Sequence, residues 1–247
     1  MAGAMGVDGA AGRWACAVWA GPGAAPVLLL AEDPADVRRR AVEHGVAAVG
    51  LDLPLGLVDE GSRGADLAAR RALLRSAEGP DARSAGSRVF LTPARPVVDH
   101  GGSYAEARAL ARALGAPSPS AQAFALLAHV RAWDAEARRW PDLGAPPLLE
   151  VHPEVSLARM AGRVLAPKRS ARGAAQRLGL LAGDRGLACG RDALDGALAA
   201  APVGVALDDA LDAAAAAWSA RRAAEGHAEP LAEGEQRDGD RVVAIWV

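Results

Sequence analysis

The sequence has few of the residues that mark several common protein classes. Its 247 residues include two cysteines, Cys16 and Cys189, too few for a disulfide framework, so we expect a reducing, cytoplasmic location. No apolar run approaches the roughly 20 residues of a membrane-spanning helix, so we expect no membrane association. The opening MAGAMGVDG lacks the charged and apolar regions of a signal peptide.

Strong net charge and aromatic side chains are also scarce. The net charge is −2 and aromatic residues make up 4% of the chain, which argues against a long nucleic-acid footprint built on charge and base stacking. Lysine occurs once, at Lys168, against 27 arginines. The sequence contains neither a GxxxxGK[ST] loop nor a GxSxG elbow, which argues against a P-loop nucleotide site and an α/β-hydrolase nucleophile.

Hydrophobic residues make up 51% of the chain, which is enough for a packed core. We predict one α/β domain over residues 1–247. Glycine and proline divide residues 4–33 into three apolar runs that we predict as consecutive antiparallel strands. Asp33 and Pro34 begin a predicted helix that closes at Gly45. The apolar residues 46–57 follow as a strand buried on both faces.

The remaining elements are predicted as follows. Residues 61–145 form a helical insertion that carries 12 arginines against 8 acidic residues. Within it, the proline-broken residues 87–98 are predicted to be extended. The sheet resumes before Pro153 with a strand and then a helix, helices with loops fill residues 168–200, a long helix covers 207–222, and the chain closes on a strand.

The helix LDDALDAAAAAWSARR, residues 207–222, begins with three aspartates and continues without charge for eight residues. An exposed helix face would continue with lysine, arginine or glutamate, so the small residues indicate close packing. Capping accounts for Asp208, but it accounts poorly for Asp212, a full turn inside. A bound cation would relieve the repulsion between these like charges, so we favour a metal site that includes Asp209 and Asp212.

Two further aspartates end apolar strands. Asp8 lies between Gly6 and Gly9, and Asp52 interrupts VGLDLPLG. A carboxylate in such a run is costly to ionise unless it is paired or metal-bound; the alternative is an ordinary strand-end turn residue. Glu150 ends a third strand, with His152 close by as a residue that supports the site.

The chain resembles domain-of-unknown-function family 429, predicted nucleases of RNase H-like fold. The stretches that carry the resemblance run in order along most of the chain. They are GVDGAAGRW, GLDLPLGL, RGADLAARR, SRVFLTPAR, EVHPEVSLARMAG, PKRSARGAAQR, DDALDAAAAAWSARRAAEG and AIWV. Two departures from the pattern are Ala65 in place of cysteine and Ser219 in place of threonine. The resemblance implies a mixed sheet of three antiparallel strands plus parallel strands.

The resemblance also implies a set of site residues. The acidic centre comprises Asp8, Asp52, Glu150, Asp209 and Asp212, with the four aspartates as metal ligands. Nearby motif positions are Arg63, Asp66, Arg70, Arg95, Gln122, His152 and Lys168, of which all but Asp66 are assigned to substrate binding.

An all-oxygen acidic set suits Mg²⁺ or Mn²⁺, and two such ions can hydrolyse a phosphodiester. We therefore expect a metal-dependent nuclease whose partner is nucleic acid. One alternative is a phosphotransferase of the actin and sugar-kinase type, with residues 183–190 as a second phosphate loop. Another is a metal-binding protein that acts on a small phosphorylated ligand rather than on a polymer.

Overall fold

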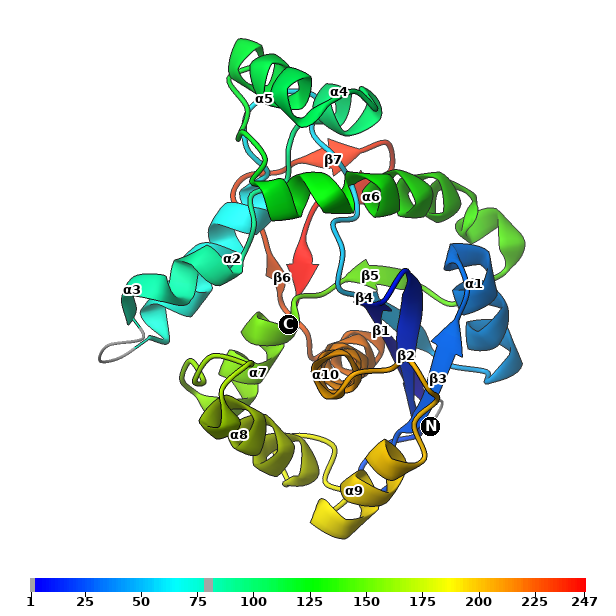
Figure 1. Cartoon of the computed structure of the whole chain (residues 1–247). Helices are drawn as coiled ribbons and strands as arrows, with labels where there is room; N and C mark the ends of the chain where they lie inside the picture. The colour runs from blue at the N-terminus through cyan, green and yellow to red at the C-terminus, as the bar shows by residue number, and fades with distance from the viewer. Residues whose placement is uncertain (1–2, 78–81) are drawn as a thin grey trace.

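Three strands at the start of the chain form an antiparallel meander in the computed structural model, which describes residues 3–77 and 82–247 (Figure 1). They are β1 (Ala4–Ala10), β2 (Arg13–Trp19) and β3 (Val27–Ala31). Then β4 (Ala48–Leu51) pairs parallel to β1, and β5 (Leu148–Glu150) pairs parallel to β4. The sheet order β3-β2-β1-β4-β5 confirms the mixed sheet expected of an RNase H-like α/β fold.

Helices supply most of the remaining structure. They are α1 (Pro34–Glu43), α2 (Gly64–Arg75), α3 (Ala82–Ala85), α4 (Arg95–Asp99), α5 (Tyr104–Ala113), α6 (Ala121–Arg139), α7 (Pro153–Ala161), α8 (Ala171–Ala182), α9 (Arg191–Ala199) and α10 (Leu207–Ala224). Two 3₁₀ turns are η2 (Gly86–Arg88) and η3 (Pro141–Leu143). Near the C-terminus, β6 (Pro230–Leu231) pairs with β9 (Ile245–Trp246), and β7 (Arg237–Asp238) pairs with β8 (Arg241–Val242).

Helix α10 packs directly on one face of the sheet, where Figure 1 shows it almost end-on beside β1 and β4. Gly6 and Gly50 are neighbours in the β1–β4 register and both face this helix. A Cβ on Gly6 would lie 2.0 Å from the carbonyl oxygen of Ala213, so the two backbones are in contact. Residues 210–221 of α10 are all buried, which explains the alanine run without charges.

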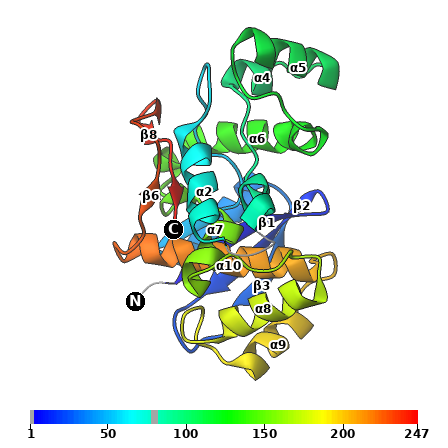
Figure 2. The ribbon, with the colours of Figure 1, turned by 90° about the vertical axis from the view of Figure 1, so that its left-hand side faces the viewer.

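The opposite face of the sheet packs against α1 and α6. Alternation along β1 puts Met5 and Val7 in this second core, together with Val37 of α1 and Trp133 of α6. Helices α4 and α5 lie beyond α6, at the top of Figure 2. The segment between β4 and β5 therefore adds a helical layer above the sheet, at the end where β1 and β4 finish.

Several local predictions can be compared with the observed elements. The Asp33 side chain accepts a hydrogen bond from the Asp36 amide, so the predicted cap of α1 is confirmed. Asp208 is not a cap: α10 begins after Ala206, whose side chain cannot cap it. The predicted strand over 46–57 is shorter, because β4 covers only Ala48–Leu51 and the chain bends at residues 52–53. Residues 87–98 include the end of η2 and most of α4, so the extended prediction was wrong at both ends.

The C-terminal strand prediction is confirmed only in part, because residues 241–246 divide between two short ribbons. The segment 61–145 contains α2 to α6 and no strand among its described residues. Over the described part of the chain, no helix has the length and apolarity to cross a membrane.

Candidate functional site

Strand register places Asp8 and Asp52 side by side. Val7 pairs with Leu51 in the parallel β1–β4 ladder, and the Asp52 amide donates to the Val7 carbonyl at 2.9 Å. Asp8 has the same parity along β1 as Gly6, which faces α10. Both carboxylates therefore follow the α10 face of the sheet at the carboxyl ends of adjacent strands.

Asp212 reaches the same place from α10. Its helix position is one turn before Ala216, whose carbonyl lies against Gly50. The Asp212 side chain is 5% exposed. Its Oδ2 accepts from Lys168 Nζ at 2.7 Å, whereas its Oδ1 is buried and has no hydrogen-bond partner. One carboxylate oxygen is therefore left without a donor in the wall of the site.

The three aspartates disfavour each other's charge. Burial raises the pKa of Asp8, and repulsion from Asp52 and Asp212 raises it further. Burial raises the pKa of Asp52, and repulsion from Asp212 adds to the effect. Burial also raises the pKa of Asp212, which Lys168 opposes. Three carboxylates and one ammonium carry a formal charge of −2 together, which matches one divalent cation.

Lys168 is a basic side chain in direct contact with this centre. Besides its bond to Asp212, its Nζ lies 3.8 Å from Asp208 Oδ2. Its pKa is raised above its ordinary value by Asp212 and Asp8, which outweigh the effect of burial. Lys168 therefore stays charged, with its ammonium held beside the three aspartates.

A cavity of about 700 Å³ opens over these side chains. Asp8, Asp52, Asp212 and Lys168 line it, together with Glu150, His152 and Gln122 from the predicted set. The opposite walls come from the hairpin turn after β1, from residues 88–93 and from α6. The size is that of a pocket for a small organic ligand.

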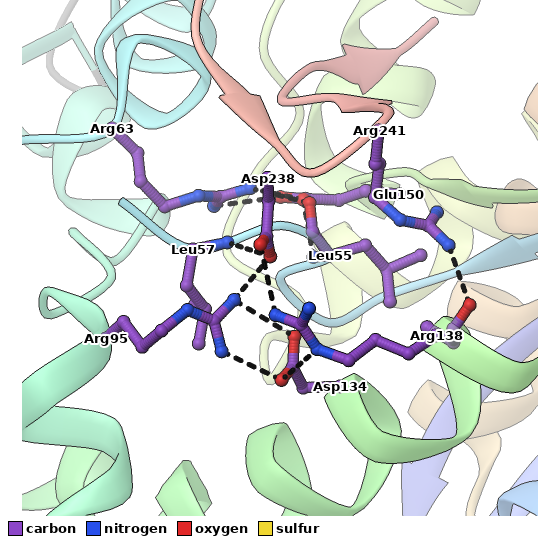
Figure 3. Close-up of polar contacts among 10 residues, drawn as sticks. Leu55, Leu57, Arg63, Arg95, Asp134, Arg138, Glu150, Asp238 and Arg241 are labelled. Atoms are coloured by element: carbon purple, nitrogen blue, oxygen red, sulfur yellow. Dashed lines mark hydrogen bonds and ion pairs between the residues drawn. The ribbon is translucent and has the colours of Figure 1, made fainter. Parts of the chain in front are cut away.

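Glu150 is paired inside the protein. Its Oε2 accepts from Arg63 Nη2 at 2.5 Å and from the Leu55 amide at 2.7 Å (Figure 3). The same guanidinium donates to Asp66 Oδ1 at 2.6 Å and to Thr92 Oγ1 at 3.1 Å. Arg63 is fully buried and does not line the cavity. This network fixes the end of β5 to α2, so Glu150 and Arg63 stabilise the floor of the site.

Glu154 forms a second buried ionic cluster at the cavity wall. Arg88 Nη1 donates to its Oε2 at 2.6 Å, and Arg177 pairs with its other oxygen. One Nη of Arg88 is buried and has no partner. Arg88 also lines the cavity, so its positive charge lies in the cavity wall.

His152 lies between these clusters, where β5 passes into α7. Burial lowers its pKa, so the imidazole is neutral near pH 7. Its Nδ1 is buried without a hydrogen-bond partner. His152 also lines the cavity.

Three other predicted residues lie outside the cavity lining. Asp209 is half-buried and directly follows Asp208 in α10. Its partial burial and the repulsion from Asp208 raise its pKa. Arg70 donates to the Val89 carbonyl at 2.9 Å and so holds the loop of residues 89–92. Arg95 belongs to a separate ionic cluster.

Figure 3 shows that cluster, which we call the C-terminal clasp and define as Arg95, Asp134, Arg138 and Asp238. Arg95 Nη1 donates to Asp134 at 2.9 Å, and Arg95 also pairs with Asp238. Arg138 donates to Asp134 at 3.2 Å and to Asp238 at 3.0 Å. The Leu57 amide donates to Asp238 at 3.0 Å. The clasp joins α4, α6 and β7 to the segment that follows Asp52.

The donor set of the aspartate centre fits a divalent metal ion. It offers only oxygen atoms, of which Asp212 Oδ1 is buried and unpartnered. Mg²⁺ typically uses one or two carboxylates and keeps other positions for water and phosphate. Within residues 3–77 and 82–247, no three histidine, cysteine, aspartate or glutamate side chains are arranged so that they could hold a metal ion as they stand. Lys168 occupies Oδ2 of Asp212, which leaves Oδ1 as the oxygen that would face a metal ion.

Sequence reasoning missed several residues of the site. Arg88 and Thr92 occur in the stretch SRVFLTPAR, and Glu154 ends EVHPE. Their positions in those motifs could have identified them as residues of the site. The partnership of Glu154 with Arg177 joins α7 to α8, and no local pattern marks it.

Comparison with known proteins gives one match. A family model described as "Protein of unknown function (DUF429)" matches residues 6–237. No curated protein and no solved structure matches the chain.

Proposed function

This chain belongs to the DUF429 family of proteins of unknown function, and from the geometry of its site we propose that it is a metal-dependent nuclease that hydrolyses phosphodiester bonds. The observation that carries the proposal is the convergence of Asp8, Asp52 and Asp212 in a cavity beside Lys168. Carboxylates are rarely buried together unless a cation or protons relieve their repulsion. The RNase H-like sheet order supports the same proposal by analogy of fold.

Each residue has a role in this mechanism. Asp8, Asp52 and the free Oδ1 of Asp212 would hold Mg²⁺ or Mn²⁺. When bound, such an ion supplies a water of lowered pKa and stabilises negative charge on phosphoryl oxygens. Lys168 and Arg88 neutralise the phosphate and orient it toward the carboxylates.

A small phosphorylated molecule is a second candidate substrate. The cavity has the volume of a small-ligand pocket, and the net charge of −2 provides no broad attraction for a polymer. The phosphotransferase alternative gains less support, because residues 183–190, its expected second phosphate loop, do not line the cavity.

The test is cleavage by purified protein with Mn²⁺ or Mg²⁺ of single-stranded and structured DNA and RNA, and of a chromogenic phosphodiester. Asp8→Asn, Asp52→Asn and Asp212→Asn should each lower the rate at least about 100-fold, since each removes a ligand charge. Asp192→Asn is the matched control, because Asp192 is exposed on α9 and lies outside the cavity. Its rate should equal that of the wild type.

Two results would count against the proposal. One is activity equal to that of Asp8→Asn on every substrate. The other is cleavage that survives chelation by EDTA. If Mn²⁺ raises the melting temperature but only small phosphate esters are cut, the small-ligand candidate replaces the nuclease.

A further inference from the structure

The cavity has an apolar half that the acidic chemistry does not use. The aspartates, Lys168 and Arg88 occupy one part of its lining, whereas Trp14, Phe90, Leu126 and Val130 contribute another. A phosphate with one or two metal ions would occupy only a fraction of about 700 Å³. The remaining volume therefore faces a predominantly hydrocarbon wall.

Phe90 is held in an exposed position by its neighbours. Its residue is 41% exposed, which is unusual for an aromatic side chain in a cavity wall. The backbone on either side is anchored, because Val89 O accepts from Arg70 and the Thr92 amide donates to Asp66 Oδ2 at 2.6 Å. The ring is thus presented on a fixed loop and is only partly covered by the rest of the protein.

Helix α6 supplies the facing wall. Gln122 and Leu126 are four residues apart and therefore lie on one side of the helix. Both line the cavity, and Leu126 is 36% exposed. Gln122 is exposed, and its side chain makes no hydrogen bond within the described residues. Its amide therefore offers a donor and an acceptor at the edge of an apolar surface.

The cavity joins this apolar half to the acidic centre, because side chains from both faces of the sheet line it. Trp14 lies opposite Gly9 in the β1–β2 ladder, and Gly9 directly follows Asp8. Gly9 has no side chain, so no Cβ separates the indole of Trp14 from the turn beside Asp8. Asp8 belongs to the α10 face and Trp14 to the face of Val7, so a ligand with its phosphate at the aspartates would reach Trp14 around the end of the sheet.

We infer that the apolar half binds the planar ring of a nucleotide-like ligand, an aromatic heterocycle joined to a phosphate, with Phe90 and Leu126 against its faces and Gln122 at its polar edge. The inference rests on the proposed function for the position of the phosphate. Proteins bind single extruded bases in this way, between apolar side chains and with an amide at the hydrogen-bonding edge. The ligand is a free nucleotide or an unpaired nucleotide of a strand.

The experiment compares two ligands that differ in the ring. Thymidine 5′-monophosphate and deoxyribose 5-phosphate are titrated by calorimetry into the whole protein with Mn²⁺. We expect the nucleotide to bind at least about tenfold more tightly, as stacking of one base typically gives. Leu126→Ser and Phe90→Ser should reduce this preference to about threefold or less, with binding of the sugar phosphate unchanged. Gln122→Ala should weaken nucleotide binding alone.

Leu143→Ser is the matched control, since Leu143 is also 40% exposed but lies outside the cavity. It should keep the preference of the wild type. Equal affinities for the two ligands, no binding of either at millimolar concentration, or equal losses in Leu126→Ser and Leu143→Ser would overturn the inference. A thymidine hexanucleotide distinguishes a free nucleotide from a nucleotide in a strand. If the hexanucleotide binds more tightly than the mononucleotide, the ligand is a strand. If it binds more weakly, the ligand is a free nucleotide.

Hydrolysis separates this inference from the proposed function. Thymidine 5′-(p-nitrophenyl phosphate) and methyl p-nitrophenyl phosphate share the scissile bond, but only the first has a nucleobase. Cleavage of both at equal kcat/KM supports the nuclease and removes the ring subsite. A preserved binding preference without any cleavage keeps the ring subsite and removes the nuclease.

Discussion

At the scale of residues, the charge of each ionisable side chain in the site depends on the groups that surround it. Asp212 shares its charge with Lys168, and Glu150 is held by Arg63. Burial raises the pKa of Asp52 and repulsion from Asp212 adds to the effect, which Lys168 opposes only in part. Folding therefore disfavours the charged form of this carboxyl.

Asp52→Asn should stabilise the protein near pH 7. A carboxyl whose pKa is raised by folding favours the folded state below its unfolded pKa, and this contribution is lost as the pH rises through the folded pKa. Asparagine does not ionise and avoids that loss. We expect a gain of about 0.5–2 kcal/mol in the free energy of unfolding at pH 7, which shrinks toward zero near pH 4. Thermal unfolding across this pH range measures it.

Asp192→Asn, at an exposed position, should leave the melting temperature unchanged at each pH. Added Mn²⁺ should stabilise the wild type more than Asp52→Asn, since a ligand stabilises the state that binds it. A variant less stable than the wild type at pH 7 would show that Asp52 is not destabilised by its surroundings.

At the scale of elements, the contact between α10 and the sheet positions the three aspartates. The glycines of β1 and β4 let the helix backbone approach both strands, so Asp212 lies beside the strand ends. The alanine side chains of α10 are small, so they also allow the helix to approach the sheet closely. A larger side chain at this contact would separate the acids as well as the elements.

Gly6→Ala should destabilise the protein strongly. Its Cβ would meet backbone atoms of Ala213 and Ala217 at 2.0 and 2.2 Å, and backbone cannot rotate away as a side chain does. We expect a loss of about 3 kcal/mol or more in urea unfolding. Gly9→Ala in the same strand is the control, since its Cβ would meet only Trp14 at 4.0 Å. Equal stability of Gly6→Ala and Gly9→Ala would contradict the packing described.

At the scale of the whole molecule, the C-terminal residues complete the structure around the site. Asp238 bonds the Leu57 amide, and two residues earlier the Leu55 amide bonds Glu150 (Figure 3). Arg241 donates to the carbonyls of Leu148 and Ala137 at 3.1 and 3.2 Å. The end of the chain thus holds together the strand ends and the helical layer above them.

Asp238→Ala should weaken this assembly. It leaves Arg95 and Arg138 with one carboxylate between them and the Leu57 amide without its acceptor. We expect a loss of about 2–4 kcal/mol in urea unfolding. The loss should persist in part at 1 M salt, where only exposed pairs are fully screened.

Asp240→Ala tests the hairpin itself. Asp240 is exposed in the turn of the same β7–β8 ribbon, so its removal should change stability by less than about 0.5 kcal/mol. Equal losses in Asp238→Ala and Asp240→Ala would assign the effect to the turn and not to the clasp.

The sequence by itself predicted the order of the elements along the chain and the position of acids at strand ends, because periodicity and turn residues act over a few neighbours. It placed Asp8 and Asp52 on neighbouring strands and indicated that α10 is closely packed. The tertiary structure decided which acids meet. It lined the cavity with Asp212 and not Asp209, and it paired Glu150 with Arg63. Such choices depend on the rotation and docking of elements far apart in the chain, and no local pattern encodes them.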